Sequence, residues 1–285
     1  MLTILQGSDL HFGSSYDPEA GEAFRRAIEE SIPDLVVIAG DLTQRAKVGE
    51  YQEARRFLDS LGGIPLVVTP GNHDVPLYRA LERLLTPFRN YRRYISPDLD
   101  TVTRVPGAVV VALNTAAPRR AIVNGRLQRR QLEFAARIFQ ECHAQEMRIV
   151  VAHHPLVPAP DAEPAEPIPD AAWILDDLRD MGAELVMGGH FHRGFVARSS
   201  AVCPAHEEAD EVVLAYSGTA TSTRGRASEA SKNSLHLLMI DEGTIKVQHK
   251  LLNREAMTFE FMREMILPRR GRPSGAVSSS SGQGR

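Results

Sequence analysis

The sequence predicts an α/β fold that ends in an antiparallel β region. Up to His192, short apolar segments alternate with longer segments whose apolar residues recur at helical spacing, the pattern of βα units around a largely parallel sheet. After His192, the remaining segments are strand-like. A chain of 285 residues can bury a large core, and we expect one domain over residues 1–267.

The strands predicted before His192 are mostly short, β-branched and free of internal polar residues. Strands of this kind are typically buried on both faces, as in a parallel sheet. They span residues 2–6, 35–39, 66–69, 109–113, 148–152 and 185–187.

Amphipathic segments between these strands are predicted helices, because charged residues occupy the side opposite the apolar one. They span residues 18–31, 48–61, 77–94, 127–145 and 170–181. Further strands are predicted at 195–198, 212–216, 234–240 and 244–251, with a hairpin turn at 241–243. We expect this C-terminal third to be antiparallel.

Two segments are predicted to lie outside regular structure. Residues 158–169 are rich in Pro, Ala and acidic residues, which is typical of a surface loop, and they lie close in sequence to His153. Residues 268–285 contain a serine run with Gly, Pro and Arg, and can bury too little apolar surface to offset the entropy of ordering them. We expect this tail to be disordered.

Composition and charge point to an ordinary globular protein. Hydrophobic residues make up 43% and charged residues 24% of the chain. A formal net charge of -3 gives no overall attraction to polyanions, so nucleic acid is not a favoured partner.

The cysteines and the apolar segments indicate the cellular compartment in which the protein is expected. Cys142 and Cys203 can form neither a disulfide framework nor a zinc knuckle, which fits a reducing compartment. The N-terminal segment lacks the features of a secretory signal, and no apolar run approaches the length of a membrane span. We expect a cytoplasmic protein; the oligomeric state is left open.

Polar clusters follow or end five of the predicted strands. In an open α/β sheet the carboxyl ends of parallel strands face one edge, where ligands bind, so clusters far apart in sequence are expected to converge there. The clusters are SDLH at 8–11, AGDL at 39–42, PGNHD at 70–74, AHHP at 152–155 and GGHFH at 188–192.

The side chains of these clusters favour metal binding. His nitrogen, Asp carboxylate and Asn amide oxygen suit divalent manganese, iron, zinc or cobalt. The accompanying glycines, which lack a Cβ, permit sharp turns and close approach of the backbone to an ion or phosphate. They are Gly40, Gly71, Gly188 and Gly189. The alternative for the Asp and Asn residues is a set of turns and helix caps.

Taken together, the clusters resemble the calcineurin-like metallophosphoesterase superfamily. Its pattern of DxH, GD, GNH followed by D or E, a later His, and GHxH is present throughout. The overall layout is most similar to bacterial class III cyclic nucleotide phosphodiesterases and glycerophosphodiesterases. The resemblance implies a four-layer αββα sandwich, in which two mixed β-sheets are flanked by helices.

The resemblance also implies a dinuclear centre with two divalent ions, manganese or iron being favoured. One ion would be held by Asp9, His11 and His192, and the other by Asn72, His153 and His190. Asp41 would bridge the two, and a hydroxide shared between the ions would be the nucleophile.

Two assignments in this set need separate mention. His73 lies outside the ligand set, so the resemblance implies that it contacts the phosphate or protonates the leaving oxygen, while Asp74 could orient its ring. His153 and His154 are adjacent and either could be the ligand. We favour His153, because Pro155 then falls in register with the family pattern of His, any residue, Pro.

Two other segments could contact an anionic substrate. One is the Arg-rich and Tyr-rich run at 79–93, for which a helix with solvated Arg side chains is the favoured alternative. The other is SGTATSTRGR at 217–226, whose alternative is a plain loop.

The resulting hypothesis is hydrolysis of a small phosphodiester, with 3′,5′-cyclic nucleotides as the first class. A metal-dependent nuclease, a phosphomonoesterase and an inactive binding scaffold of the same fold are the alternatives. A UDP-diacylglucosamine pyrophosphatase is less favoured, because that group typically has Arg where His73 stands.

Overall fold

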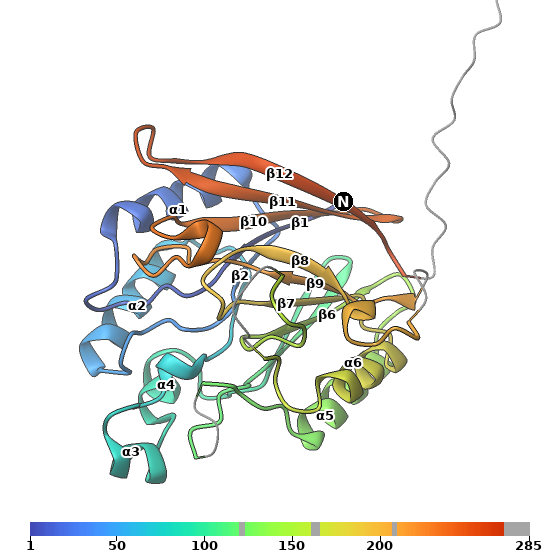
Figure 1. Cartoon of the computed structure of the whole chain (residues 1–285), viewed down its shortest axis with the longest axis horizontal. Coiled ribbons are helices and arrows are strands. Elements are labelled where there is room, and N and C mark those ends of the chain that lie inside the picture. Colours follow the sequence, from blue (N-terminus) through green and yellow to red (C-terminus); the bar gives the residue numbers. More distant parts are fainter. Residues whose placement is uncertain (120–122, 161–165, 207–209, 271–285) are drawn as a thin grey trace, which may run out of the picture.

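Two six-stranded mixed sheets pack face to face in the computed structural model, which describes residues 1–119, 123–160, 166–206 and 210–270 (Figure 1). The first sheet has the order β12-β11-β10-β1-β2-β3 and the second the order β4-β5-β6-β7-β9-β8. The strands of the first sheet are β1 Leu2–Gly7, β2 Leu35–Ile38, β3 Leu66–Val68, β10 Ser234–Ile240, β11 Thr244–Asn253 and β12 Thr258–Pro268. Those of the second are β4 Thr101–Val105, β5 Ala108–Leu113, β6 Met147–Ala152, β7 Leu185–Gly188, β8 Phe195–Arg198 and β9 Val213–Tyr216.

Helices cover the outer face of each sheet and complete the four-layer sandwich (Figure 1). On the first sheet, α1 and α2 bury residues such as Phe24 and Tyr51 against Leu5 and Val36. On the second, α5 and α6 bury Phe139 and other apolar residues against the central strands. The helices are α1 Pro18–Ser31, α2 Val48–Ser60, α3 Ala80–Leu85, α4 Arg89–Tyr94, α5 Arg129–Gln140 and α6 Ala171–Asp180.

Apolar side chains from both sheets meet in a third core layer between them. Ile4 and Val37 of the first sheet belong to the same buried cluster as Val110 and Val151 of the second. Because the central strands have helices on one side and the other sheet on the other, they are buried on both faces, as their unbroken apolar sequences predict.

The parallel strands of both sheets were placed correctly from the sequence, and two strands were missed. β4 has polar and apolar residues in alternation, and β12 carries charged residues between its apolar ones, so neither has the unbroken apolar character of the buried strands. Both lie at sheet edges, where one side needs no partner.

Two other expectations were wrong. The C-terminal third is not wholly antiparallel, because the fully buried β9 pairs in parallel with β7. The single helix expected over 77–94 is split into α3 and α4 around Pro87, which has no N–H to donate and disfavours helical backbone at Thr86.

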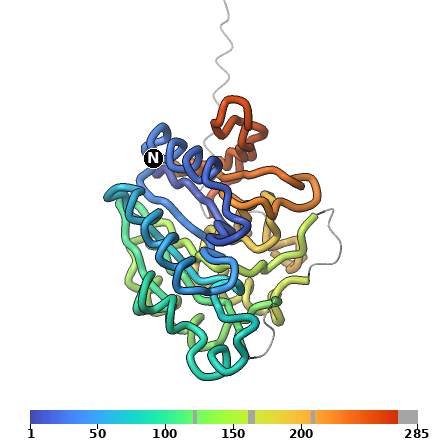
Figure 2. The backbone as a smooth tube through the Cα atoms, turned by 90° about the vertical axis from the view of Figure 1, so that its left-hand side faces the viewer, coloured from blue at the N-terminus to red at the C-terminus, as the bar shows by residue number. Residues whose placement is uncertain are grey.

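The N-terminal strand and the last three described strands share the first sheet. Figure 2 shows the blue N-terminal segments beside the orange and red C-terminal segments, as the pairing of β1 with β10 requires. Pro268, the first residue of the expected tail, closes β12, and Arg269 is buried against Glu184. Residues 271–285 lie outside the described residues. Within the described ranges, none of the helices combines the length and the apolar character needed to cross a membrane.

Candidate metal centre

Loops after β1, β2 and β3 of the first sheet meet loops after β6 and β7 of the second. Hydrogen bonds join the two sheets at this edge: the His190 N–H donates to Asp9 Oδ2 at 2.9 Å, and His153 Nδ1 donates to the Ala39 carbonyl at 2.6 Å. All seven predicted ligands occupy these loops. The convergence expected from strand topology is therefore present.

One group of donors consists of Asp9, His11, Asp41 and His192, all buried. Asp9 Oδ1 lies 3.6 Å from the Nε2 atoms of both His11 and His192. Asp41 Oδ2 lies 3.7 Å from His11 Nε2. These separations are too long for hydrogen bonds, yet the atoms face one another.

A second group of donors, His153, His154 and His190, adjoins the first. His190 Nδ1 lies 3.1 Å from Asn72 Oδ1. His153 Nε2 lies 3.5 Å from Asp41 Oδ2, the same oxygen that faces His11. Asp41 thus stands between the two groups, in the position expected of a bridging carboxylate.

The fit to metal ions can be tested on the buried atoms that lack a partner. Asp9 Oδ1, Asp41 Oδ2, His11 Nε2 and His153 Nε2 have no hydrogen-bond partner among the described residues. An unpartnered buried polar group costs about 1–3 kcal/mol, so several together need another interaction. Two ligands bound about 2.1 Å from one ion lie about 3.4–3.6 Å apart, which agrees with the separations here. The donor set fits divalent ions.

The backbone at the ligands is strained. Five of the predicted ligands, although none is glycine, have φ between 50° and 75°, in the left-handed region; they are Asp9, His11, Asp41, His190 and His192. Each such residue costs on the order of 1–3 kcal/mol and persists where the surroundings enforce it, as happens at functional sites. The strain turns these side chains inward at the ends of their strands.

Two glycines make room for the ligands. A Cβ at Gly40 would lie 2.5 Å from His153 Nδ1, and one at Gly71 would lie 2.1 Å from Asp41 Oδ1. Neither contact is possible, so any side chain at these positions would displace a donor. This agrees with the role predicted for the glycines of the motifs.

Protonation favours metal binding at several of these donors. Burial alone would raise the pKa of Asp41, but the facing His153 and His73 hold it well below its usual value. Burial lowers the pKa of His190 to about 4, and His153 contributes to the shift. For His153 burial acts in the same direction, yet the charge of Asp41 raises its pKa to about 9. At neutral pH, Asp41 is therefore anionic and His190 neutral, whereas His153 is protonated and must release the proton on Nε2 to bind an ion.

Comparison with known proteins agrees with this geometry. The model of the calcineurin-like phosphoesterase family matches residues 2–194, about two thirds of the chain. The chain belongs to the calcineurin-like phosphoesterase family. It is a metal-dependent phosphoester hydrolase, and the family uses divalent metal ions.

The relatives of this phosphoesterase include cyclic nucleotide enzymes. A probable cyclic nucleotide phosphodiesterase from Synechococcus is 26% identical, over 68% of this chain and 75% of the relative. A cAMP/cGMP dual specificity phosphodiesterase from Mycobacterium tuberculosis is 25% identical, over 82% and 73%. A purple acid phosphatase from yellow lupin shares the fold, with a TM-score of 0.69 at 11% identity over 95% of this chain. This chain spans 54% of that phosphatase.

Asp74 does not orient the His73 ring in this phosphoesterase, contrary to the expectation. Its carboxylate accepts hydrogen bonds from the N–H groups of Leu42, Thr43 and Gly71 at 2.9–3.1 Å. Short, neighbouring loop segments present these donors, so the carboxylate ties the loops after β2 and β3 together. The ring is oriented instead by the Gln44 carbonyl, which accepts from His73 Nδ1 at 2.8 Å.

Residues of the segment 217–226 hydrogen-bond the loop after β1 and bring positive charge to the site. Thr219 and Thr221 donate to the carbonyls of Asp9 and Leu10, which anchors the first ligand loop. Arg224 and Arg226 act on the site: their positive charges add to the effect of burial in lowering the pKa values of His192 and His190. Both arginines lie in the segment that the sequence indicated as a possible contact for an anionic substrate, although neither was named individually as a site residue.

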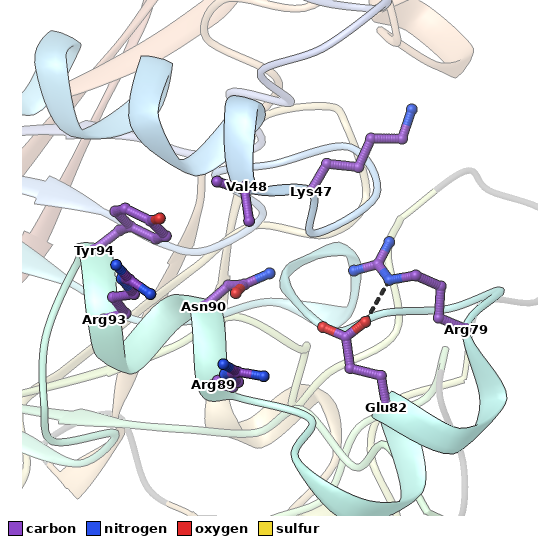
Figure 3. Close-up of a pocket in the computed structure, with 8 residues that line it drawn as sticks. All are labelled: Lys47, Val48, Arg79, Glu82, Arg89, Asn90, Arg93 and Tyr94. Carbon is purple, nitrogen blue, oxygen red and sulfur yellow. Dashed lines mark hydrogen bonds and ion pairs between the residues drawn. The ribbon is translucent and has the colours of Figure 1, made fainter.

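The Arg-rich segment and the start of α2 together line a basic pocket. Figure 3 shows the pocket between the start of α2 and the α3–α4 region, with Arg79 paired to Glu82. Its volume is about 450 Å³, and Lys47, Arg89 and Arg93 line it without an ion pair to any described residue. Arg79 also donates to the carbonyl of Ala46, which fixes the segment that follows Gln44.

Proposed function

We propose that this phosphoesterase hydrolyses small phosphodiesters, with 3′,5′-cyclic nucleotides as the leading substrate class. The observation that carries the proposal is the pair of adjoining donor groups with Asp41 Oδ2 facing both. The names of the Synechococcus and Mycobacterium relatives support the choice of substrate class.

The ligand assignment is part of the proposal. Asp9, His11 and His192 hold one ion, Asn72, His153 and His190 hold the other, and Asp41 is shared. Manganese or iron is favoured over zinc or cobalt. Two such ions, when bound, supply Lewis-acid activation of the phosphoryl group and of the attacking water.

His153 is preferred over His154 because of its contacts. The Ala39 carbonyl can only accept, so His153 Nδ1 carries a proton and Nε2 is the atom left to bind an ion beside Asp41. The ring of His154 is held by Thr115 through Nδ1 at 2.7 Å, and its free Nε2 belongs to the same donor group as His190. We propose that His154 lies beside the ligands and is not itself one of them.

His73 is proposed as the group that meets the substrate. Its Nδ1–H is fixed by Gln44, and its ring stands edge-on to His11 at 4.8 Å between centroids. With Nδ1 protonated, a second proton on Nε2 would give a cation that stabilises the phosphate or protonates the leaving oxygen. A cytoplasmic location and a single domain over residues 1–267 complete the proposal.

Rates on four substrates with added Mn²⁺ test it: bis-p-nitrophenyl phosphate, p-nitrophenyl phosphate, cyclic AMP and single-stranded DNA. We expect turnover of cyclic AMP and of the aryl diester to exceed that of the monoester and of DNA. Asp41→Asn is the control, since a neutral amide is a poor bridge between two cations, and it should lose most of both its activity and its bound metal.

Each alternative has its own outcome in this comparison. Preference for DNA would support a nuclease, and preference for the monoester a phosphomonoesterase. No metal-dependent turnover of any ester would indicate a binding scaffold. Two tightly bound ions and normal rates in Asp41→Asn would place the bridge elsewhere.

A further inference from the structure

A third group of metal-type donors lies away from the centre described above: Asp176, Cys203 and His206. One ligand atom of each lies within 4.8 Å of the others. Asp176 belongs to α6, whereas the other two follow β8, in the turn that leads to β9. The fold, rather than a sequence motif, brings them together, and the sequence alone assigned His206 no role.

The group is remote from the catalytic edge. In the second sheet, Arg198 at the end of β8 pairs with Val213, which opens β9 and also pairs with the first residue of β7. The catalytic loops leave the opposite ends of these strands, at Gly188 and Tyr216. The turn with Cys203 and His206 therefore lies at the opposite end of these strands from the catalytic loops.

The His206 ring is positioned as metal-binding histidines usually are. Nδ1 lies 2.7 Å from Ser199 Oγ, and Nε2 points to Asp176 Oδ1 at 2.7 Å. Ser199 Oγ also accepts the Val212 N–H, so it is fixed in place. The hydrogen bond at Nδ1 orients the ring, while Nε2 is hydrogen-bonded to Asp176 and must exchange this contact for the ion.

Cys203 and His206 form one tight turn, because the His206 N–H donates to the Cys203 carbonyl at 2.9 Å. Both residues are buried, and the thiol has only a long contact of 3.5 Å with the Ala172 carbonyl. The Asp176 side chain is half exposed, which gives an ion a path from solvent and gives the carboxylate room to move.

We propose that Asp176, Cys203 and His206 form a third metal site, which binds one zinc ion and ties α6 to the β8–β9 turn. Thiolate, imidazole and carboxylate are each zinc ligands, and three protein ligands leave the fourth tetrahedral position to water. On binding, the contact between Nε2 and Oδ1 opens from 2.7 Å to about 3.4 Å, the separation of two ligands on a tetrahedral zinc ion. Arg179, 3.9 Å from Asp176 Oδ1, already pairs more closely with Asp180 and is not displaced.

Co²⁺ can enter both sites, but only the cobalt bound at the cysteine site gives a thiolate absorption, because neither group of donors at the catalytic centre contains a cysteine. The full-length protein is stripped of metal and titrated with Co²⁺, and the thiolate-to-cobalt charge-transfer absorption is recorded. We expect one thiolate-bound cobalt per chain, displaced by Zn²⁺. Absence of this absorption from the wild-type protein would overturn the proposal.

The chain supplies a matched control, since it has two cysteines. Cys142→Ser, a change at the half-buried cysteine after α5, should keep the absorption, and Cys203→Ser should lose it. Asp176→Asn, a change on an exposed carboxylate, should raise the Kd for Zn²⁺ at least tenfold. Absorption that survives in Cys203→Ser, or an unchanged Kd in Asp176→Asn, would contradict the site.

Discussion

His73 serves the centre with both its backbone and its ring. The backbone N–H donates to Asp41 Oδ1 at 2.8 Å, while the ring is hydrogen-bonded to the Gln44 carbonyl and stands edge-on to His11. Removal of the ring leaves the backbone contact in place. Mutation at this position can therefore separate catalysis from metal binding.

We predict that His73→Ala retains both ions and loses about 10²- to 10⁴-fold in turnover, the range for a positioned proton donor or charge stabiliser. If the ring acts as an acid, the loss should be smaller on a p-nitrophenyl ester than on a nucleoside ester, because p-nitrophenolate leaves without protonation. Metal content and kcat on both esters measure this. Equal losses would assign the ring to phosphate binding, and unchanged rates would remove it from the mechanism.

Residue identity and spacing were enough to predict which loops bring the His, Asp and Asn donors together. Asp9, His11, Asp41 and the His190–His192 pair each follow a buried strand, a pattern visible in the sequence. The role of Asp74 could not be predicted in this way, because it depends on N–H groups that a neighbouring loop presents only in the folded chain. The same holds for Gln44, which acts through its carbonyl and not its side chain.

Among the turns, the one after His192 is held by a buried carboxylate. Glu229 Oε1 accepts the Gly194 N–H at 2.7 Å and lies 3.1 Å from His249 Nε2, while Oε2 accepts from Ser234 Oγ at 2.5 Å. Burial alone would raise the pKa of Glu229, but these donors lower it below 4.5. The carboxylate thus fixes Gly194, two residues after the proposed ligand His192.

We predict that Glu229→Gln lowers the free energy of unfolding by about 1–3 kcal/mol at pH 7. Because the folded-state pKa is lower than the unfolded one, the wild-type advantage is full well above the usual pKa of a glutamate and is lost as the pH falls through the lower, folded value. Urea unfolding between pH 7 and pH 3 measures it. Glu260→Gln, on the exposed surface, should match the wild type, and a difference independent of pH would refute the argument.

Elements with one repeating pattern were predictable, and elements shaped by their neighbours were not. α1 has an amphipathic sequence and an Asp17 cap, and its bounds followed from the sequence. The break between α3 and α4 depends on Pro87 within a pattern that otherwise continues. The parallel pairing of β9 depends on where its chain returns to the sheet, which its four residues do not encode.

At the scale of the whole molecule, the metal centre joins the two sheets. Asp9, His11, Asp41 and Asn72 come from loops of the first sheet, and His153, His190 and His192 from loops of the second. Ions bound by both groups stabilise the packed arrangement but not the unfolded chain, so binding is linked to folding.

We predict that Mn²⁺ at 100 times its Kd stabilises the metal-stripped protein by about 2.7 kcal/mol for each ion bound, and that each ion raises Tm by roughly 5–10 °C. Calorimetry at fixed protein concentration measures the shift, and a chelator should reverse it. Asp41→Asn should show a much smaller rise. An equal rise in both proteins would mean that the ions bind elsewhere.

The position of β1 has a consequence for how the chain folds. Leu5 pairs with Val36 on one side and with Leu237 on the other. One of the two strands next to β1 is therefore β10, which lies more than 200 residues later in the sequence. Pairings of such long sequence separation form slowly. During synthesis the β1 edge stays open until β10 has left the ribosome, and in that interval an apolar strand with unpaired backbone groups is exposed to aggregation and to chaperones.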